Sequence, residues 1–156
     1  MEINSFLAGW VIRFLENKDA IRKDIVKIER NCEGFDFCIQ YKEKAKYFLV
    51  KPIIDSSIFE NIKKEESFGI IALNNARNIK FLANEWRRLA EYKFLNFYFI
   101  SPFSNTEKAW IIYPYTHNMI CDSSSLELGL KSMAEMVEPI GIEEIEGKIK
   151  VQQSPN

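Results

Sequence analysis

The stretch that decides the fold is "FDFCIQYKEKAKYFLVKP", residues 35–52. Its first half repeats aromatic or apolar side chains at every second position, the period of a β-strand, at Phe35, Phe37, Ile39 and Tyr41. The polar "KEKA" predicts a turn. "KYFLVKP" then predicts a second strand, and regular pairing should end near Lys51 because Pro52 has no N–H to donate.

The flanking segments extend this pair into a larger α/β pattern. Helical spacing of apolar residues predicts a helix over residues 4–19, and residues 24–30 predict a strand that completes a three-strand meander. Further elements are expected downstream: a short helix over 56–66, a strand over 67–74, a long helix over 74–93, strands over 94–103 and 108–115, and a helix over 123–139.

This order predicts a single three-layer α/β domain (mixed α+β) over residues 1–156, in which helices pack on a sheet. The last two strands are apolar on both faces, which indicates that both faces of the sheet are covered. We divide the domain into a core, 1–138, and a tail, 139–156. In the tail we expect a small hairpin around Glu146 and Gly147.

Composition limits the classes of function. The chain has 156 residues, of which 47% are hydrophobic and 28% charged, and its net charge is −1. These values are typical of a folded domain and argue against a chain-wide attraction to nucleic acid or to a membrane. Three cysteines without a CxxC pair favour reduced thiols and a cytoplasmic location. No apolar run approaches the ~20 residues that span a bilayer.

The order of helix, meander, helix and strand resembles the PD-(D/E)XK, or restriction-endonuclease-like, superfamily over roughly the first hundred residues. Asp36 lies on the second predicted strand and Lys51 at the end of the third, where the family carries an acid and an acid-x-Lys motif. Glu16 lies on the first helix, where some members add another acid. The resemblance implies that Asp36, Lys51 and Glu16 are catalytic, with Asp36 binding Mg²⁺ and Lys51 positioning the nucleophile.

The motif departs from the family at Leu49, which stands where the second carboxylate belongs and has no oxygen for a metal. We therefore expect a catalytically degenerate nuclease-like fold, used in nucleic-acid transactions or as a binding scaffold, without a cofactor. One alternative is a protein-interaction or chaperone-like adaptor. Another is an active Mg²⁺-dependent phosphodiesterase with a rearranged carboxylate set that draws on Glu16, Glu33 or Asp55.

The predicted long helix carries a basic stripe opposite its apolar face. Arg77, Lys80, Arg87 and Arg88 fall within one sector. Such a stripe suits phosphate contacts, although a charged stripe opposite a core face is also typical of the solvated side of a helix. The expected partners are accordingly nucleic acid, another protein or a second copy of the chain in a dimer, and no membrane.

Overall fold

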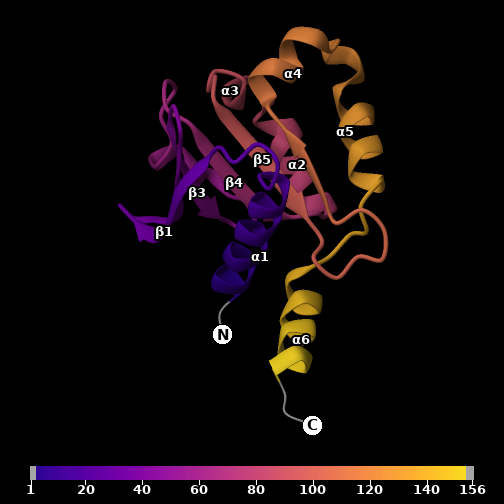
Figure 1. Ribbon diagram of the computed structural model, residues 1–156. Coiled ribbons are helices and arrows are strands. Elements are labelled where there is room, and N and C mark those ends of the chain that lie inside the picture. Colours follow the sequence, from indigo (N-terminus) through magenta and orange to yellow (C-terminus); the bar gives the residue numbers. More distant parts are fainter. Residues whose placement is uncertain (1–2, 154–156) are drawn as a thin grey trace.

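We describe the protein from a computed structural model that covers residues 3–153 (Figure 1). Over these residues six strands form one sheet, in the spatial order of the sequence. The strands are β1 (Ile25–Cys32), β2 (Phe35–Tyr41), β3 (Ala45–Val50), β4 (Phe68–Leu73), β5 (Leu95–Ile100) and β6 (Ala109–Ile112). β1, β2 and β3 form the predicted antiparallel meander, β4 and β5 continue parallel to β3, and β6 returns antiparallel. The predicted mixed α/β class is confirmed.

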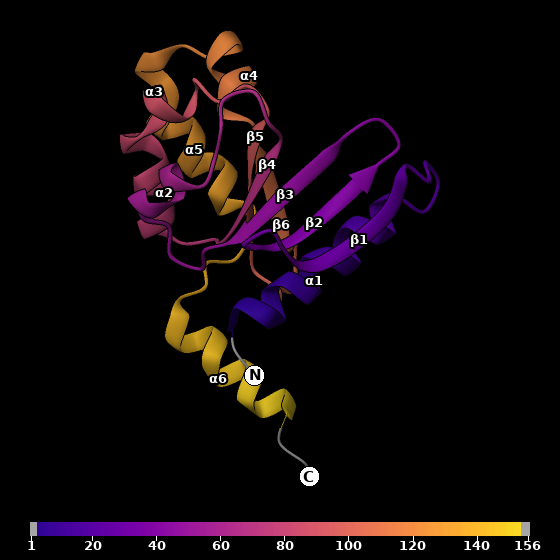
Figure 2. The same ribbon diagram turned by 90° about the vertical axis from the view of Figure 1, so that its left-hand side faces the viewer.

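Helices cover both faces of the sheet. α1 (Ile3–Lys18) and α6 (Ile142–Gln153) pack on one face, and the other carries η1 (Ser56–Glu60), α2 (Ala76–Asn84), α3 (Trp86–Leu89) and α5 (Leu126–Glu135) (Figure 2). α4 (Pro114–Ile120) and η2 (Ser123–Ser125) connect β6 to α5. Over residues 3–153 no helix is long and apolar enough to cross a membrane.

The central strands explain why two cores form. Every residue of β4 and of β5 is buried. Because side chains alternate across a strand, Ile70 and Ala72 of β4 join the core beneath α2, whereas Ile71 and Leu73 join the core beneath α1. Cover on both faces was predicted for the last two strands, and it is found for β5. In β6, Trp110 and Ile112 are buried on one face, whereas Ala109 and Ile111 on the other are partly buried.

The tail forms a helix, so the predicted hairpin around Glu146 and Gly147 is wrong. Residues 154–156 of the tail lie outside the described part. Ile145 and Ile149 of α6 are buried in the core that α1 also covers. Their four-residue spacing places them on one helical face, and burial of that face outweighs the turn preference of Gly147.

Two further differences concern the helices. The predicted helix over 74–93 is interrupted at Glu85, whose φ of −100° and ψ of 12° are not helical, so α2 and α3 are separate. After the interruption, the Trp86 indole donates to Asn118 Oδ1 of α4 at 3.0 Å. α4 itself begins directly after β6, with Pro114 at a first-turn position where its missing N–H costs nothing; the sequence had indicated continued strand there.

Candidate functional site

The Asp36 carboxylate binds the protein's own backbone. Regular pairing of β2 with β3 ends at Phe37 and Phe48, and the next step is taken by Asp36, whose Oδ2 accepts a hydrogen bond from the Val50 N–H at 2.7 Å. Phe35 leaves the face that was predicted for it and packs against Tyr47 and Phe68 on the opposite side from Phe37. Asp36 therefore lies where β2 stops pairing with β3, although Phe35 still pairs with Cys32 of β1.

Lys51 lies at the same end of the sheet and supports the turn after β3. Its N–H donates to the Ile71 carbonyl at 2.8 Å, and its Nζ donates to Ser57 Oγ at 3.2 Å. The Ser57 hydroxyl in turn donates to the carboxylate of Asp55, which caps η1. The Ser57 hydrogen bonds, and more weakly the Lys51 charge, lower the pKa of Asp55.

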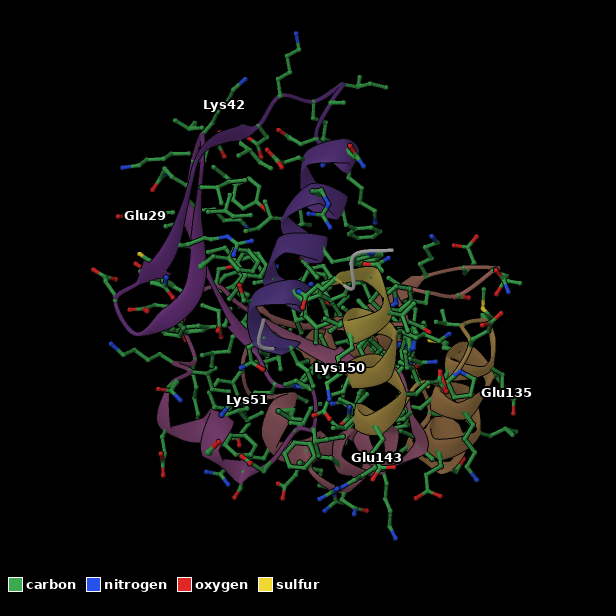
Figure 3. The ribbon with its side chains drawn as sticks, turned by 90° about the horizontal axis from the view of Figure 1, so that it is seen from below. Glu29, Lys42, Lys51, Glu135, Glu143 and Lys150 are labelled. Atoms are coloured by element: carbon green, nitrogen blue, oxygen red, sulfur yellow. The ribbon has the colours of Figure 1, made fainter. Side chains whose placement is uncertain are left out.

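Glu16 is placed far from these two residues. The amide of Asn4, at the start of α1, donates to the Val50 carbonyl at 3.3 Å. Glu16 comes twelve residues later, which is about 18 Å along the helix axis at ~1.5 Å per residue. Figure 3 shows α1 running from the Lys51 end of the β2–β3 hairpin toward the Lys42 end.

The remaining acid position of the motif is occupied by Leu49, which has no carboxylate and is buried in the core beneath α2. Within residues 3–153, no group of three or more His, Cys, Asp or Glu side chains is placed to hold a metal ion. The structure thus brings Asp36 and Lys51 to one end of the sheet and leaves Glu16 at the other.

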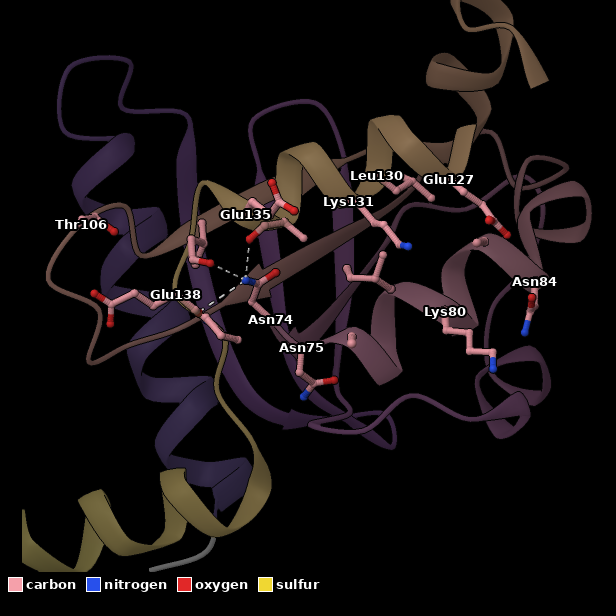
Figure 4. A pocket seen from close by; sticks show the side chains of 16 residues that line it. Asn74, Asn75, Lys80, Asn84, Thr106, Glu127, Leu130, Lys131, Glu135 and Glu138 are labelled. Atoms are coloured by element: carbon pink, nitrogen blue, oxygen red, sulfur yellow. Dashed lines mark hydrogen bonds between the residues drawn. The ribbon is translucent and has the colours of Figure 1, made fainter. Parts of the chain in front are cut away.

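A groove lies where the chain leaves β4, between α2 and α5 (Figure 4). It has a volume of about 850 Å³, within the range of ligand sites in proteins. Its apolar lining comes from both helices and from the segment just after α5: Ile79, Ala83, Leu130, Ala134 and Val137. The groove opens beside the carboxyl end of a parallel strand, the usual place of ligands in α/β sheets.

Asn74, the first residue after β4, holds the two sides of the groove together. It is 2% exposed. Its Nδ2 donates to the carbonyls of Ala134 at 3.0 Å and Val137 at 2.9 Å, and its Oδ1 accepts from the Trp110 indole at 2.7 Å. These bonds attach the C-terminal end of α5 to the end of β4. They also engage both polar atoms of the Asn74 side chain, so its amide is not free to bind a ligand in the groove.

Two more asparagines fix α2. Asn75 caps the helix by accepting from the Asn78 N–H at 3.0 Å, and its Nδ2 donates to the Ile140 carbonyl. Asn78 is fully buried and donates to the carbonyls of Pro52 and Leu73, both at 2.8 Å. Nothing in the sequence indicated the groove, because its second wall lies some fifty residues away in α5.

The rim of the groove carries both charges. Lys80 and Asn84 project from α2, and Glu127, Lys131 and Glu135 project from α5 (Figure 4). All five side chains are exposed. An apolar floor between charged rims of mixed sign suits a ligand with one apolar face and polar edges of either charge.

The predicted basic stripe is divided by the break at Glu85. Lys80 lies at the rim of the groove, and Arg87 and Arg88 line an adjoining hollow of about 550 Å³ that shares Ala83 with it. Arg88 is stacked on Phe59, with 3.6 Å between its guanidinium carbon and the ring centroid. The four basic residues therefore occupy two helices rather than one continuous helical face.

No protein family, curated protein or solved structure matches this chain.

Proposed function

We propose that this domain is a binding scaffold without catalysis, and that its α2–α5 groove receives an amphipathic segment of a partner protein. The observation that carries the proposal is the groove itself: an apolar channel of about 850 Å³ with charged rims, built on buried and fully hydrogen-bonded asparagines. Rigid support of this kind is what a recognition surface needs, because it lowers the ordering cost of binding.

The occupancy of the nuclease-like positions supports the absence of catalysis. The Asp36 carboxylate is engaged by the Val50 N–H, and Lys51 by Ser57. Both residues already have a role in ending the β2–β3 pair. The restriction-endonuclease-like resemblance, with Asp36, Lys51 and Glu16 as remnants of a catalytic set, stays part of this proposal, and so does a cytoplasmic location with the free thiols Cys32, Cys38 and Cys121 reduced.

The small side chains of the groove favour a helical occupant. Ala83 on α2 and Ala134 on α5 both line it, and small residues on two helices let the backbone of a third approach closely. The mixed rim charges then pair with polar residues at the edges of the bound helix, as in other helix-in-groove complexes.

Photo-crosslinking tests this proposal. With p-benzoyl-phenylalanine in place of Lys131, at the rim, irradiation in the source cells is expected to capture one defined protein. The same group in place of Glu43, in the exposed β2–β3 turn, should not capture it. Ala83→Trp, which fills the groove, should abolish capture, whereas Ala20→Trp at an exposed site should not. Equal capture from positions 131 and 43, or capture that survives Ala83→Trp, would contradict the proposal.

A nucleic-acid partner is the second candidate. Arg77, Lys80 and Arg87 are exposed, and none of them forms an ion pair with the described residues. Oligonucleotide binding that weakens steeply with salt, with a slope reduced by the triple change Arg77→Ala, Lys80→Ala and Arg87→Ala, would support this reading. A flat titration at low salt would remove it.

A further inference from the structure

β1 forms an open edge of the sheet. It is the first strand in the spatial order and pairs only with β2. The Ile25 N–H donates to the Asp19 carboxylate at 2.9 Å, but the backbone of residues 26–31 has no hydrogen-bond partner outside β2 among the described residues. An edge with unpaired N–H and C=O groups is able to pair with a strand of another chain.

The opposite edge of the sheet offers less room for such pairing. β6 has four residues against eight in β1, and Glu107, two residues before β6, already forms a bridge with Val137. Five of the eight residues of β1 are exposed, whereas none of β6 is. β1 is therefore the longer and the more accessible edge.

Two charges of opposite sign lie on the open edge without partners. Lys27 and Glu29 are two residues apart, so they project to the same face of β1, where both line one hollow. Their neighbours on β2 are the uncharged Gln40 and Cys38. Neither charge forms an ion pair with a described residue, and Figure 3 shows Glu29 pointing away from the body of the protein.

Ile28 lies between these two charges and projects to the other face, the one that α1 covers. It packs against the core there but is only half-buried, because no strand lies beyond β1. The sequence Lys27-Ile28-Glu29 is self-complementary: a second copy that runs in the opposite direction presents the same two charges in the opposite order.

We infer that the chain forms a two-fold symmetric dimer in which the β1 edges of two copies pair antiparallel, centred on Ile28. In this register Lys27 of each protomer lies opposite Glu29 of the partner subunit, so that two ion pairs form. The Ile28 side chains meet at the two-fold axis and bury each other. The sheet then continues from one protomer into the next.

The same charges disfavour the neighbouring registers. A centre at Lys27 or at Glu29 places each of these charges opposite its own copy, and like charges directly opposite are destabilising. The regular edge is also short. It begins after a bulge between Ile25 and Lys27 and ends at Asn31, whose φ is 53°. We therefore expect a reversible dimer that forms through residues 27–30 and depends on protein concentration.

The dimer is independent of the proposed partner-binding function. β1 is separated by β2 and β3 from β4, beside which the α2–α5 groove opens, and Figure 2 shows β1 on the far side of the molecule from α2 and α5. A partner in the groove and a second copy at the β1 edge can therefore be bound together.

Sedimentation equilibrium of the full chain over a wide range of protein concentration tests the inference. The wild type should pass from monomer to dimer as its concentration rises. Lys27→Glu and Glu29→Lys each create two like-charge pairs across the edge, and each should raise the dimer dissociation constant at least about tenfold at low salt. Lys42→Glu and Glu43→Lys make the same charge changes in the exposed β2–β3 turn and should leave association unchanged.

Charge reversal separates lost pairing from lost folding. The double variant with Lys27→Glu and Glu29→Lys restores both opposite-charge pairs and should dimerise as the wild type does. An equimolar mixture of the two single variants should likewise form a heterodimer. Amide hydrogen exchange should become slower at residues 27–30 as concentration rises. A wild type that stays monomeric, single variants that dimerise like the wild type, a double variant that stays monomeric, or a dimer without this protection would each overturn the inference.

Discussion

The Asp36 carboxylate lies 2.7 Å from the Val50 backbone nitrogen and accepts its hydrogen bond. Val50 is 1% exposed, so water cannot replace this acceptor. Where β2 and β3 separate, the Asp36 side chain thus replaces the backbone carbonyl that would otherwise accept the Val50 hydrogen bond.

Loss of this bond should appear as lost stability. Asp36→Ala is expected to lower the free energy of unfolding by about 1–3 kcal/mol, the cost of an unsatisfied buried N–H. Asp36→Asn keeps an acceptor oxygen and should cost less. Urea unfolding measures both, with Glu43→Gln in the exposed turn as control. Plasmid cleavage with Mn²⁺ that wild type shows and Asp36→Asn lacks would instead support the phosphodiesterase alternative.

A second test concerns the hydrogen bonds by which Asn74 joins the two sides of the groove. Asn74→Asp is nearly isosteric and can still accept from the Trp110 indole, but its carboxylate cannot donate to the carbonyls of Ala134 and Val137. We expect a loss of at least about 3 kcal/mol, because several buried groups lose partners together. Denaturant unfolding followed by tryptophan fluorescence measures it. Asn84→Asp at the exposed rim should change little, and equal effects at the two sites would contradict the assignment.

Two glycines should respond in opposite directions to alanine. At Gly69 a Cβ would lie 2.7 Å from the Phe48 ring and 3.1 Å from that of Tyr98, both of which are buried. Gly69→Ala should therefore destabilise the protein by about 1–3 kcal/mol through overpacking. Gly147, inside α6, has open space around it. Gly147→Ala should stabilise by about 0.5–1 kcal/mol through helix propensity, and thermal unfolding of the pair gives the comparison.

Lys46 should make stability depend on pH. Burial lowers its folded pKa to about 7, below its unfolded value, so the unfolded chain binds more protons between about pH 7 and 10, and stability rises with pH across that window. Burial raises the pKa values of three tyrosines, Tyr41, Tyr98 and Tyr113. They hold their protons when folded and reverse the trend above about pH 10.

Lys46→Met isolates the lysine's share. It removes the amine and keeps most of the volume, so it should raise the free energy of unfolding more at about pH 6 than at about pH 9. Urea unfolding at the two pH values gives the difference, and Lys42→Met at an exposed site is the control. A stabilisation by Lys46→Met that does not change with pH would contradict a lowered pKa.

The sequence by itself determined most of the strand pattern and the order of elements. Two-residue alternation in β2, and the mostly apolar segments that became β4 and β5, are local signals of strands and of how many faces are buried. Even Lys46 carried such a signal, since alternation places it on the same face as Phe48 and Val50. Predictions from local preference were wrong where packing opposed that preference. At Gly147 a turn was predicted, but the segment is helical because the helix buries Ile145 and Ile149.

The sites depended on tertiary structure. The family resemblance predicted that Asp36 binds a metal. Only the tertiary structure shows that its carboxylate accepts a hydrogen bond from the Val50 N–H. The groove requires α2 and α5 to meet, and Asn74 joins them through carbonyls sixty residues away. The aromatic rings around the Lys46 amine come from β3, β5 and the residue that follows β6. Periodicity reports which face a side chain takes; which distant group meets it there is set by the packing of the whole chain.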